Sequence, residues 1–174
     1  MVEFLASIFS LLSVILAIKE NRNTWSIGII GIVLYSYIFY NQKLYYNLGL
    51  QMLYLIQSSI GLYYWIRNKK IYGKDVNIKN GSSFIEKLSI FMLIFSIFLF
   101  SKQHDRLDIL TSVLSFIACY FLIKGNLENW IFWIIADILY VYMFYTNHMY
   151  ISSFLYFIFL LLAIYGYHEW RKKI

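Results

Sequence analysis

The most regular feature of the chain is a series of long apolar runs that end at charged or strongly polar residues. As a helix, each run would be apolar on all sides, whereas a helix on a soluble domain has a single apolar stripe. A helix needs about 20 apolar residues to cross a bilayer, and each run is near this length. The runs cover residues 2–18, 24–40, 44–66, 84–100, 107–123, 128–145 and 149–170. The pattern predicts an all-α integral membrane protein with seven transmembrane helices.

The composition agrees with a protein surrounded by lipid. Hydrophobic residues make up 61% of the chain and charged residues only 14%, whereas soluble domains are about half apolar and a quarter charged. Proline is absent, so long helices can run without interruption. The formal net charge is +6, but the basic residues stand at the ends of the apolar runs and not on one soluble face. We therefore expect contact with the lipid bilayer and no nucleic-acid partner.

The distribution of basic residues predicts the orientation of the chain in the membrane. With the predicted spans, one side receives Lys19, Arg22, Arg67, Lys69, Lys70, Lys74, Lys79, Lys87, Lys124, Arg171, Lys172 and Lys173, and the other receives Lys43, Lys102 and Arg106. Lys and Arg are enriched in cytoplasmic loops, so the first side is cytoplasmic. The N-terminus is then outside and the C-terminus inside, and the polar segment 67–83 is a cytoplasmic loop.

The chain repeats itself with an offset of 105 positions and no gap. The matches include Asn21 with Asn126, Trp25 with Trp130, Tyr35 with Tyr140, Gly61 with Gly166 and Trp65 with Trp170. We expect a first three-helix repeat in 1–66, a linking helix in 84–100 and a second three-helix repeat in 101–174. A single linking span leaves both repeats in the same orientation, which is a transporter architecture with a site between the repeats.

The run 128–145 carries the most suggestive polar group. Trp130, Trp133, Asp137 and Tyr140 lie on one stripe of a helix, because they are spaced by 3, 4 and 3 positions. A carboxylate at this depth is costly unless it is paired, protonated or hydrated. Tryptophan faces beside a carboxylate favour binding of a flat cation. Alternatively, the tryptophans lie at the membrane interface and Asp137 bonds a neighbouring helix.

The run 44–66 carries amides that could recognise a substrate. Gln51 and Tyr54 share a stripe, and Gln57 lies at its shoulder. Amides bind hydroxyl or carboxamide groups as donors and acceptors, but they also hold transmembrane helices together. Both interpretations stay open for Gln51 and Gln57.

Few other residues indicate chemistry. Asn23 and Trp25, at the start of the second run, are candidates for the substrate site, although capping of that helix by Asn21 or Asn23 is the favoured interpretation. The histidines lack metal-ligand spacing, and no nucleophile–base pair or phosphate loop is present. We therefore predict a protein that is not an enzyme and has no cofactor or metal.

These residues resemble the PnuC-type vitamin transporters along nearly the whole chain. The segment 128–137 is similar to the WxxW segment of that family, and Gly166 and Trp170 follow in the familiar order. In the first half, the matching residues are Asn23, Trp25, Gly28, Gln51, Tyr54, Gln57, Gly61 and Trp65. One departure is Ser26, where many members have proline, which puts a proline-based hinge in doubt.

The resemblance implies a SWEET-like arrangement of three-helix repeats around a central site in the bacterial cytoplasmic membrane. It also implies facilitated diffusion, a possible homotrimer, and trapping of the imported vitamin by a cytoplasmic kinase. Among the family's substrates, nicotinamide riboside and thiamine are flat cations that suit Asp137, whereas riboflavin is neutral. We expect nicotinamide riboside, with thiamine as the nearest alternative. A membrane scaffold or channel subunit, with a packed centre, is the alternative from another class.

The orientation can be tested with introduced cysteines. In a Cys119→Ser background, cysteines at Asn80 and Lys172 should resist membrane-impermeant thiol reagents on intact cells, because both positions are predicted to be cytoplasmic. Both should become labelled after the membrane is permeabilised. Ready labelling of both on intact cells would reverse the predicted topology.

Overall fold

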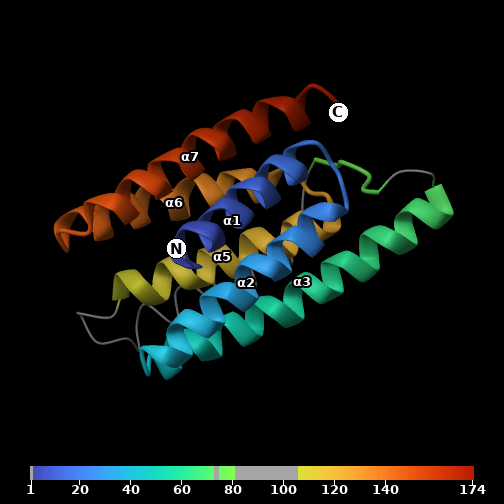
Figure 1. Cartoon of the computed structure of the whole chain (residues 1–174). Coiled ribbons are helices and arrows are strands. Elements are labelled where there is room, and N and C mark those ends of the chain that lie inside the picture. The colour runs from blue at the N-terminus through green and yellow to red at the C-terminus, as the bar shows by residue number, and fades with distance from the viewer. Residues whose placement is uncertain (1, 73–74, 81–105) are drawn as a thin grey trace. The chain divides into compact units, whose positions relative to one another are not determined.

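The computed structural model of the chain describes residues 2–72, 75–80 and 106–174, and all regular structure in these ranges is helical. The helices are α1 (Val2–Ile18), α2 (Asn23–Asn41), α3 (Tyr45–Tyr72), α5 (Arg106–Lys124), α6 (Glu128–Thr146) and α7 (Tyr150–Arg171) (Figure 1). The predicted all-α class is confirmed for this part of the chain. The predicted linking helix at 84–100 lies outside the described residues, so the arrangement of seven helices stays a prediction.

The third helix continues beyond its predicted end at residue 66 and runs through Tyr72. The predicted loop 67–83 therefore begins too early. Two of the added residues, Lys69 and Lys70, lie in the last turn of α3, where positive charge is favourable at the negative end of the helix dipole. Residues 67–72, which extend the helix, include no glycine and no proline. Hydropathy alone placed the boundary where charge begins, but charge does not end a helix.

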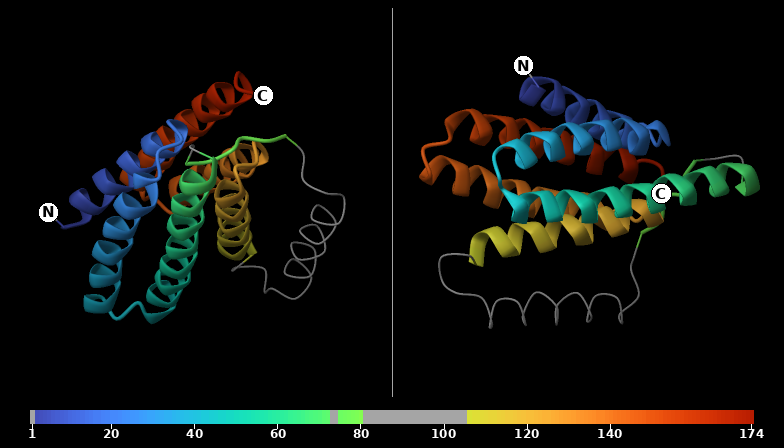
Figure 2. Two further views of the ribbon diagram at one scale, coloured as in Figure 1. Left: turned by 90° about the vertical axis from the view of Figure 1, so that its right-hand side faces the viewer. Right: turned by 60° about the horizontal axis from the view of Figure 1, so that its bottom comes forward.

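The described helices form two compact units, Met1–Asn77 and Ile78–Ile174. In the first unit α1 packs against α2 and α2 against α3, and in the second α5 packs against α6 and α6 against α7. Figure 2 shows these successive helices side by side within each unit. Among the described residues, each unit thus has three helices that pack in order along the chain.

The turns between helices repeat the same backbone geometry. Glu20 and Gly125 have positive φ angles of 57° and 71°, and Lys43 and His148 both have φ of 59°. Each pair is separated by the offset of the sequence repeat. In all four turns the next residue donates its N–H to the carbonyl five positions earlier, at 2.9 Å. This bond closes a Schellman motif, which satisfies carbonyls that the helix end leaves free. The repeat therefore extends from side chains to the backbone.

A tryptophan pair joins the second and third helices of each unit. Trp25 and Trp65 meet edge to face with ring centroids 5.5 Å apart and planes at 88°, and Trp130 and Trp170 do so at 5.5 Å and 89°. All four rings are buried. Edge-to-face packing of this kind is favourable for aromatic rings. The same kind of contact therefore stabilises each unit internally.

A glycine allows each of these tryptophan pairs to form. A Cβ atom added at Gly61 would lie 2.7 Å from ring atoms of Trp25, and one added at Gly166 would lie 2.7 Å from the ring of Trp130. Real Cβ contacts are not this short, so the helix backbone approaches the ring more closely than any other residue permits. Small residues at helix interfaces serve this purpose in membranes.

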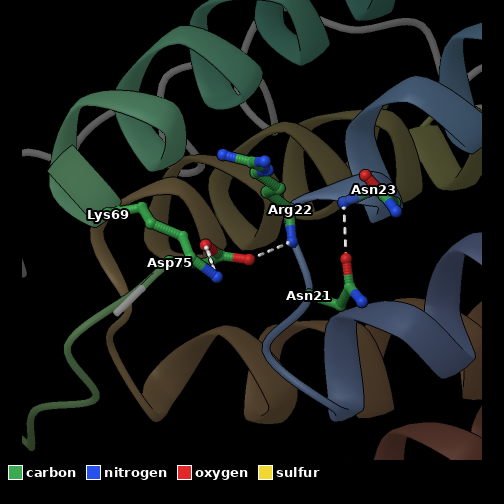
Figure 3. Close-up of polar contacts among 5 residues, drawn as sticks. All are labelled: Asn21, Arg22, Asn23, Lys69 and Asp75. Carbon is green, nitrogen blue, oxygen red and sulfur yellow. Dashed lines mark hydrogen bonds and ion pairs between the residues drawn. The ribbon is translucent and has the colours of Figure 1, made fainter. Parts of the chain in front are cut away.

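The segment after α3 caps the start of α2. The backbone N–H of Arg22 donates to Oδ2 of Asp75 at 3.0 Å, and Lys69 Nζ lies 3.2 Å from Oδ1 of the same carboxylate (Figure 3). The N–H of Asn23 donates to Oδ1 of Asn21 at 2.9 Å, so Asn21 has the capping role foreseen as one alternative. The first N–H groups of a helix have no intrahelical partner, and these contacts satisfy two of them.

The equivalent position in the second unit is satisfied differently. Leu127 corresponds to Arg22, and its N–H donates to the carbonyl oxygen of Lys79 at 2.9 Å. Lys79 also donates its own N–H to the carbonyl of Gly125 at 2.9 Å. Asp75 thus supplies an acceptor to the N-terminal turn of α2 in the first unit, and Lys79 supplies one to that of α6 in the second.

The outer surfaces of the helices match a lipid environment. Within the described residues, α2, α6 and α7 are both long and apolar enough to cross a bilayer, and α1 and Ile109–Lys124 are apolar but shorter. Large apolar side chains are exposed on every described helix. Apolar surface of this extent is unfavourable in water, whereas lipid tails solvate it.

Glycine substitutions test the tryptophan contact. Gly61→Ala and Gly166→Ala should each lower the free energy of unfolding by about 1–3 kcal/mol, because the added methyl group overlaps a fixed ring. The loss should appear although alanine favours a helix over glycine by about 1 kcal/mol. The measurement is the thermal unfolding midpoint in detergent, followed by tryptophan fluorescence.

Gly49→Ala is the matched control, since beyond its own turn of helix no heavy atom of the described residues lies within 4 Å of the added Cβ. This variant should be as stable as the wild type or slightly more stable. Equal midpoints for all three variants would contradict the proposed role of the glycines.

Candidate functional site

The sequence repeat separates residues that build the fold from residues that are special to one unit. Trp130 corresponds to Trp25 and makes the same packing contact in its own unit. By contrast, Trp133 and Asp137 correspond to Gly28 and Ile32 in the first half of the sequence. A residue that only maintains the three-helix unit should recur in both halves. The departures from the repeat therefore indicate where a binding site would differ from the scaffold.

Asp137 is the buried carboxylate of the second unit. It lies on α6 with 4% of its surface exposed. No hydrogen bond or ion pair reaches its carboxylate from the residues that the structure describes. A buried carboxylate without a partner costs several kcal/mol if it is ionised. A cationic ligand at this position would remove much of that cost.

Trp133 lies one helical turn before Asp137, on the same stripe of α6. Its side chain is half-buried. Within the described ranges it makes no ring–ring contact and no hydrogen bond. Its ring is therefore more available to a ligand than the ring of Trp130, which is 2% exposed.

Trp130 and Trp25 are packing residues in the observed structure. Gly166 lies against the ring of Trp130, Gly61 lies against the ring of Trp25, and a second tryptophan meets each ring edge to face. The indole Nε1 of each is buried and has no hydrogen-bond partner among the described residues. The two rings are thus already enclosed within their own units, which limits direct stacking on a ligand.

Tyr140 belongs to an aromatic cluster between α6 and α7. Its ring centroid lies 4.5 Å from that of Tyr156 and 5.9 Å from that of Phe144. The ring of Tyr140 is half-buried. The structure brings Tyr140 and Asp137 onto one helix face, one turn apart, and leaves the tyrosine anchored to α7.

The polar stripe of α3 belongs to the first unit. Gln51, Tyr54 and Gln57 are half-buried there, and Ser58 next to them is buried. The corresponding residues of the second unit are Tyr156, Phe159 and Leu162, so these amides also depart from the repeat. Asn23, in contrast, is exposed at the start of α2.

Two buried asparagines were not among the predicted site residues. Asn126 and Asn129 are 1% and 0% exposed, and Asn129 Nδ2 donates to the carbonyl of Asn126 at 2.6 Å. The Oδ1 atoms of both are buried without a hydrogen-bond partner among the described residues. In the first unit the corresponding side chains are satisfied: Asn21 accepts from Asn23, and Thr24 Oγ1 donates to the carbonyl of Ser13 at 2.7 Å. Their place beside Trp130 in an apolar chain was the signal that could have identified them.

The apolar helices carry half-buried amides in the first unit and a buried carboxylate in the second, which is typical of a multi-pass membrane protein with polar groups inside the membrane, as transporters have. The chain belongs to the family described as nicotinamide mononucleotide transporter, whose family model matches residues 1–172. The predicted PnuC-type resemblance is thereby confirmed, and the chain is a membrane transporter by family.

Individual relatives agree with the family. The chain is 23% identical over 201 residues to the nicotinamide riboside transporter PnuC of Escherichia coli (strain K12), covering 97% of this chain and 84% of that protein. The same values hold for the nicotinamide riboside transporter PnuC of Shigella flexneri.

A solved structure shares the fold. The crystal structure of the vitamin B3 transporter PnuC matches 98% of this chain and 80% of the solved chain, with a TM-score of 0.75 and 22% identity. At this identity the likeness establishes a common fold.

Proposed function

We propose that the chain imports nicotinamide riboside across the bacterial inner membrane by facilitated diffusion. The observation that carries this proposal is the buried carboxylate of Asp137, which has no partner among the described residues and lies one turn from the half-buried Trp133. Nicotinamide riboside has a flat aromatic ring with a positive charge, which complements the carboxylate of Asp137 and the ring of Trp133. The names of the family and of its relatives support the same class of substrate.

In the proposed site, Trp133 stacks on the pyridinium ring and Asp137 offsets its charge. A cation over a tryptophan face gains about 2 kcal/mol when both are removed from water. Tyr140 completes the aromatic wall on the same face of α6. Gln51 and Gln57 supply amide groups for the carboxamide or ribose hydroxyls, with Tyr54 beside them.

The riboside is a better candidate than the mononucleotide in the family's description. A phosphate adds between one and two negative charges at neutral pH. Asp137 would repel it, and the basic residues of the described helices stand at helix ends and not beside Asp137. Thiamine carries a flat cationic thiazolium and is the second candidate, favoured by the same carboxylate.

Asn23, Trp25 and Trp130 were also expected in the site. Their contacts support packing and helix-start roles, so we assign ligand contact first to Trp133, Asp137 and the α3 amides. Facilitated diffusion only equilibrates its substrate across the membrane. Net uptake then needs a sink, and phosphorylation by a cytoplasmic kinase supplies one because Asp137 would repel the phosphorylated product.

The stacking role of Trp133 can be measured directly. Trp133→Ala should weaken nicotinamide riboside binding at least tenfold, and Trp133→Phe should keep part of the affinity, because a smaller ring retains part of the cation–π attraction. Calorimetry on the purified protein gives the dissociation constants, and unfolding midpoints verify that the variants are folded. Unchanged binding by folded Trp133→Ala would exclude this ring from the site.

The role of the charge on Asp137 can be tested with two ligands, one cationic and one neutral. Asp137→Asn keeps the shape of the side chain and removes its charge, so it should weaken the binding of nicotinamide riboside by tenfold or more. The reduced dihydropyridine riboside has a similar outline without the positive charge, and its binding should change little. Equal losses for both ligands would make Asp137 a hydrogen-bonding or structural group, and the argument for a cationic substrate would fail.

A further inference from the structure

Helix α3 is too long to lie entirely within the hydrocarbon core. Its 28 residues span about 42 Å at 1.5 Å per residue, against about 30 Å for the core. Figure 2 shows its C-terminal end projecting past the turn between α1 and α2. Because this end carries Arg67, Lys69 and Lys70, the excess length lies in the headgroup region.

A cleft with a volume of about 360 Å³ lies along this end of α3. It is lined by Tyr63, Ile66, Arg67, Lys70 and Ile71, which follow the i, i+3, i+4, i+7, i+8 spacing of a single helix face. The face therefore combines one guanidinium group, one ammonium group, one phenol and two aliphatic side chains. This combination suits a ligand that is anionic at one end and apolar at the other.

Arg67 and Lys70 have no acidic partner among the described residues. Lys69, on another face of the same helix, has one: its Nζ lies 3.2 Å from Oδ1 of Asp75. Among the described residues, the two cations of the cleft thus have no compensating acid, although the neighbouring Lys69 is paired.

The second unit shows what the first unit lacks. Lys172 corresponds to Arg67 by the repeat offset, and its Nζ contacts Oε1 of Glu169 at 2.6 Å. This hydrogen bond raises the pKa of the Lys172 ammonium. The position equivalent to Glu169 in the first unit is Tyr64. The acidic side chain that Glu169 provides near the end of α7 therefore has no counterpart at the equivalent position of α3.

We propose that this cleft binds the headgroup of an anionic phospholipid, with the phosphate between Arg67 and Lys70 and an acyl chain along Ile66 and Ile71. Tyr63 lies at the level of the aromatic belt, where a phenol contacts both headgroup and chain. Anionic lipids concentrate on basic segments next to the membrane, by roughly fivefold for each Lys or Arg. The lipid would hold the end of α3 at the interface.

Native mass spectrometry of the full chain in detergent tests this proposal. Phosphatidylglycerol and phosphatidylcholine are titrated onto wild type, onto Arg67→Gln/Lys70→Gln, and onto Lys172→Gln/Lys173→Gln, which removes the same charge after α7. Wild type should prefer phosphatidylglycerol by roughly 25-fold. The first double variant should lose most of this preference, and the second should keep it within about twofold.

Two further measurements make the outcome decisive. The exchange variant Arg67→Lys/Lys70→Arg should retain the preference, because it keeps both charges. Glycerol phosphate, the soluble headgroup alone, should compete poorly, because it lacks the acyl chain. Equal binding of the two lipids by wild type, equal losses in both double variants, or full competition by glycerol phosphate would each overturn the proposal. None of these measurements depends on the transported substrate.

Discussion

The contact between a tryptophan ring and a glycine backbone is the constraint on which each three-helix unit depends. Between helices in a bilayer there is little hydrophobic driving force, because lipid tails are as apolar as the side chains that they would replace. Association must then come from close, specific packing. Gly61 lets α3 lie directly on the ring of Trp25, and Gly166 does the same for α7 and Trp130. The second tryptophan of each pair locks the ring from its edge.

This contact explains how one sequence pattern can build two units and still leave room for a site. The tryptophan–glycine–tryptophan set is identical in the two halves, and so are the positive-φ turns at Glu20 and Gly125 and at Lys43 and His148. Residues that fulfil these common requirements are not free to specialise. Specialisation falls on positions between them, where Trp133 and Asp137 replace Gly28 and Ile32. The scaffold is thus repeated, and the polar groups proposed to meet the substrate are not.

The partners of the charged groups differ with the position of each group relative to the apolar core of the membrane. Asp137 is enclosed in the membrane-spanning part of α6, where none of the described residues offers its carboxylate a partner. Asp75 lies outside the helices and finds its partners within its own unit, at the start of α2 and on Lys69. The basic residues at the end of α3 extend beyond the apolar core of the membrane, where lipid headgroups can compensate them. The role of a charged group therefore differs with its depth in the membrane.

The sequence by itself determined the helical class, the membrane environment, the family resemblance and the repeat. Helix periodicity and the cost of burying polar groups are local properties that any apolar run of sufficient length reveals. Spacing also placed Trp130, Trp133 and Asp137 on one stripe, but a stripe does not say which residues face a neighbouring helix. Only the tertiary structure decided that Trp130 packs on Gly166 while Trp133 remains half-buried. Likewise, it alone showed that Asp75 caps a helix 53 positions away, because a contact between distant residues depends on the path of the whole chain and not on local spacing.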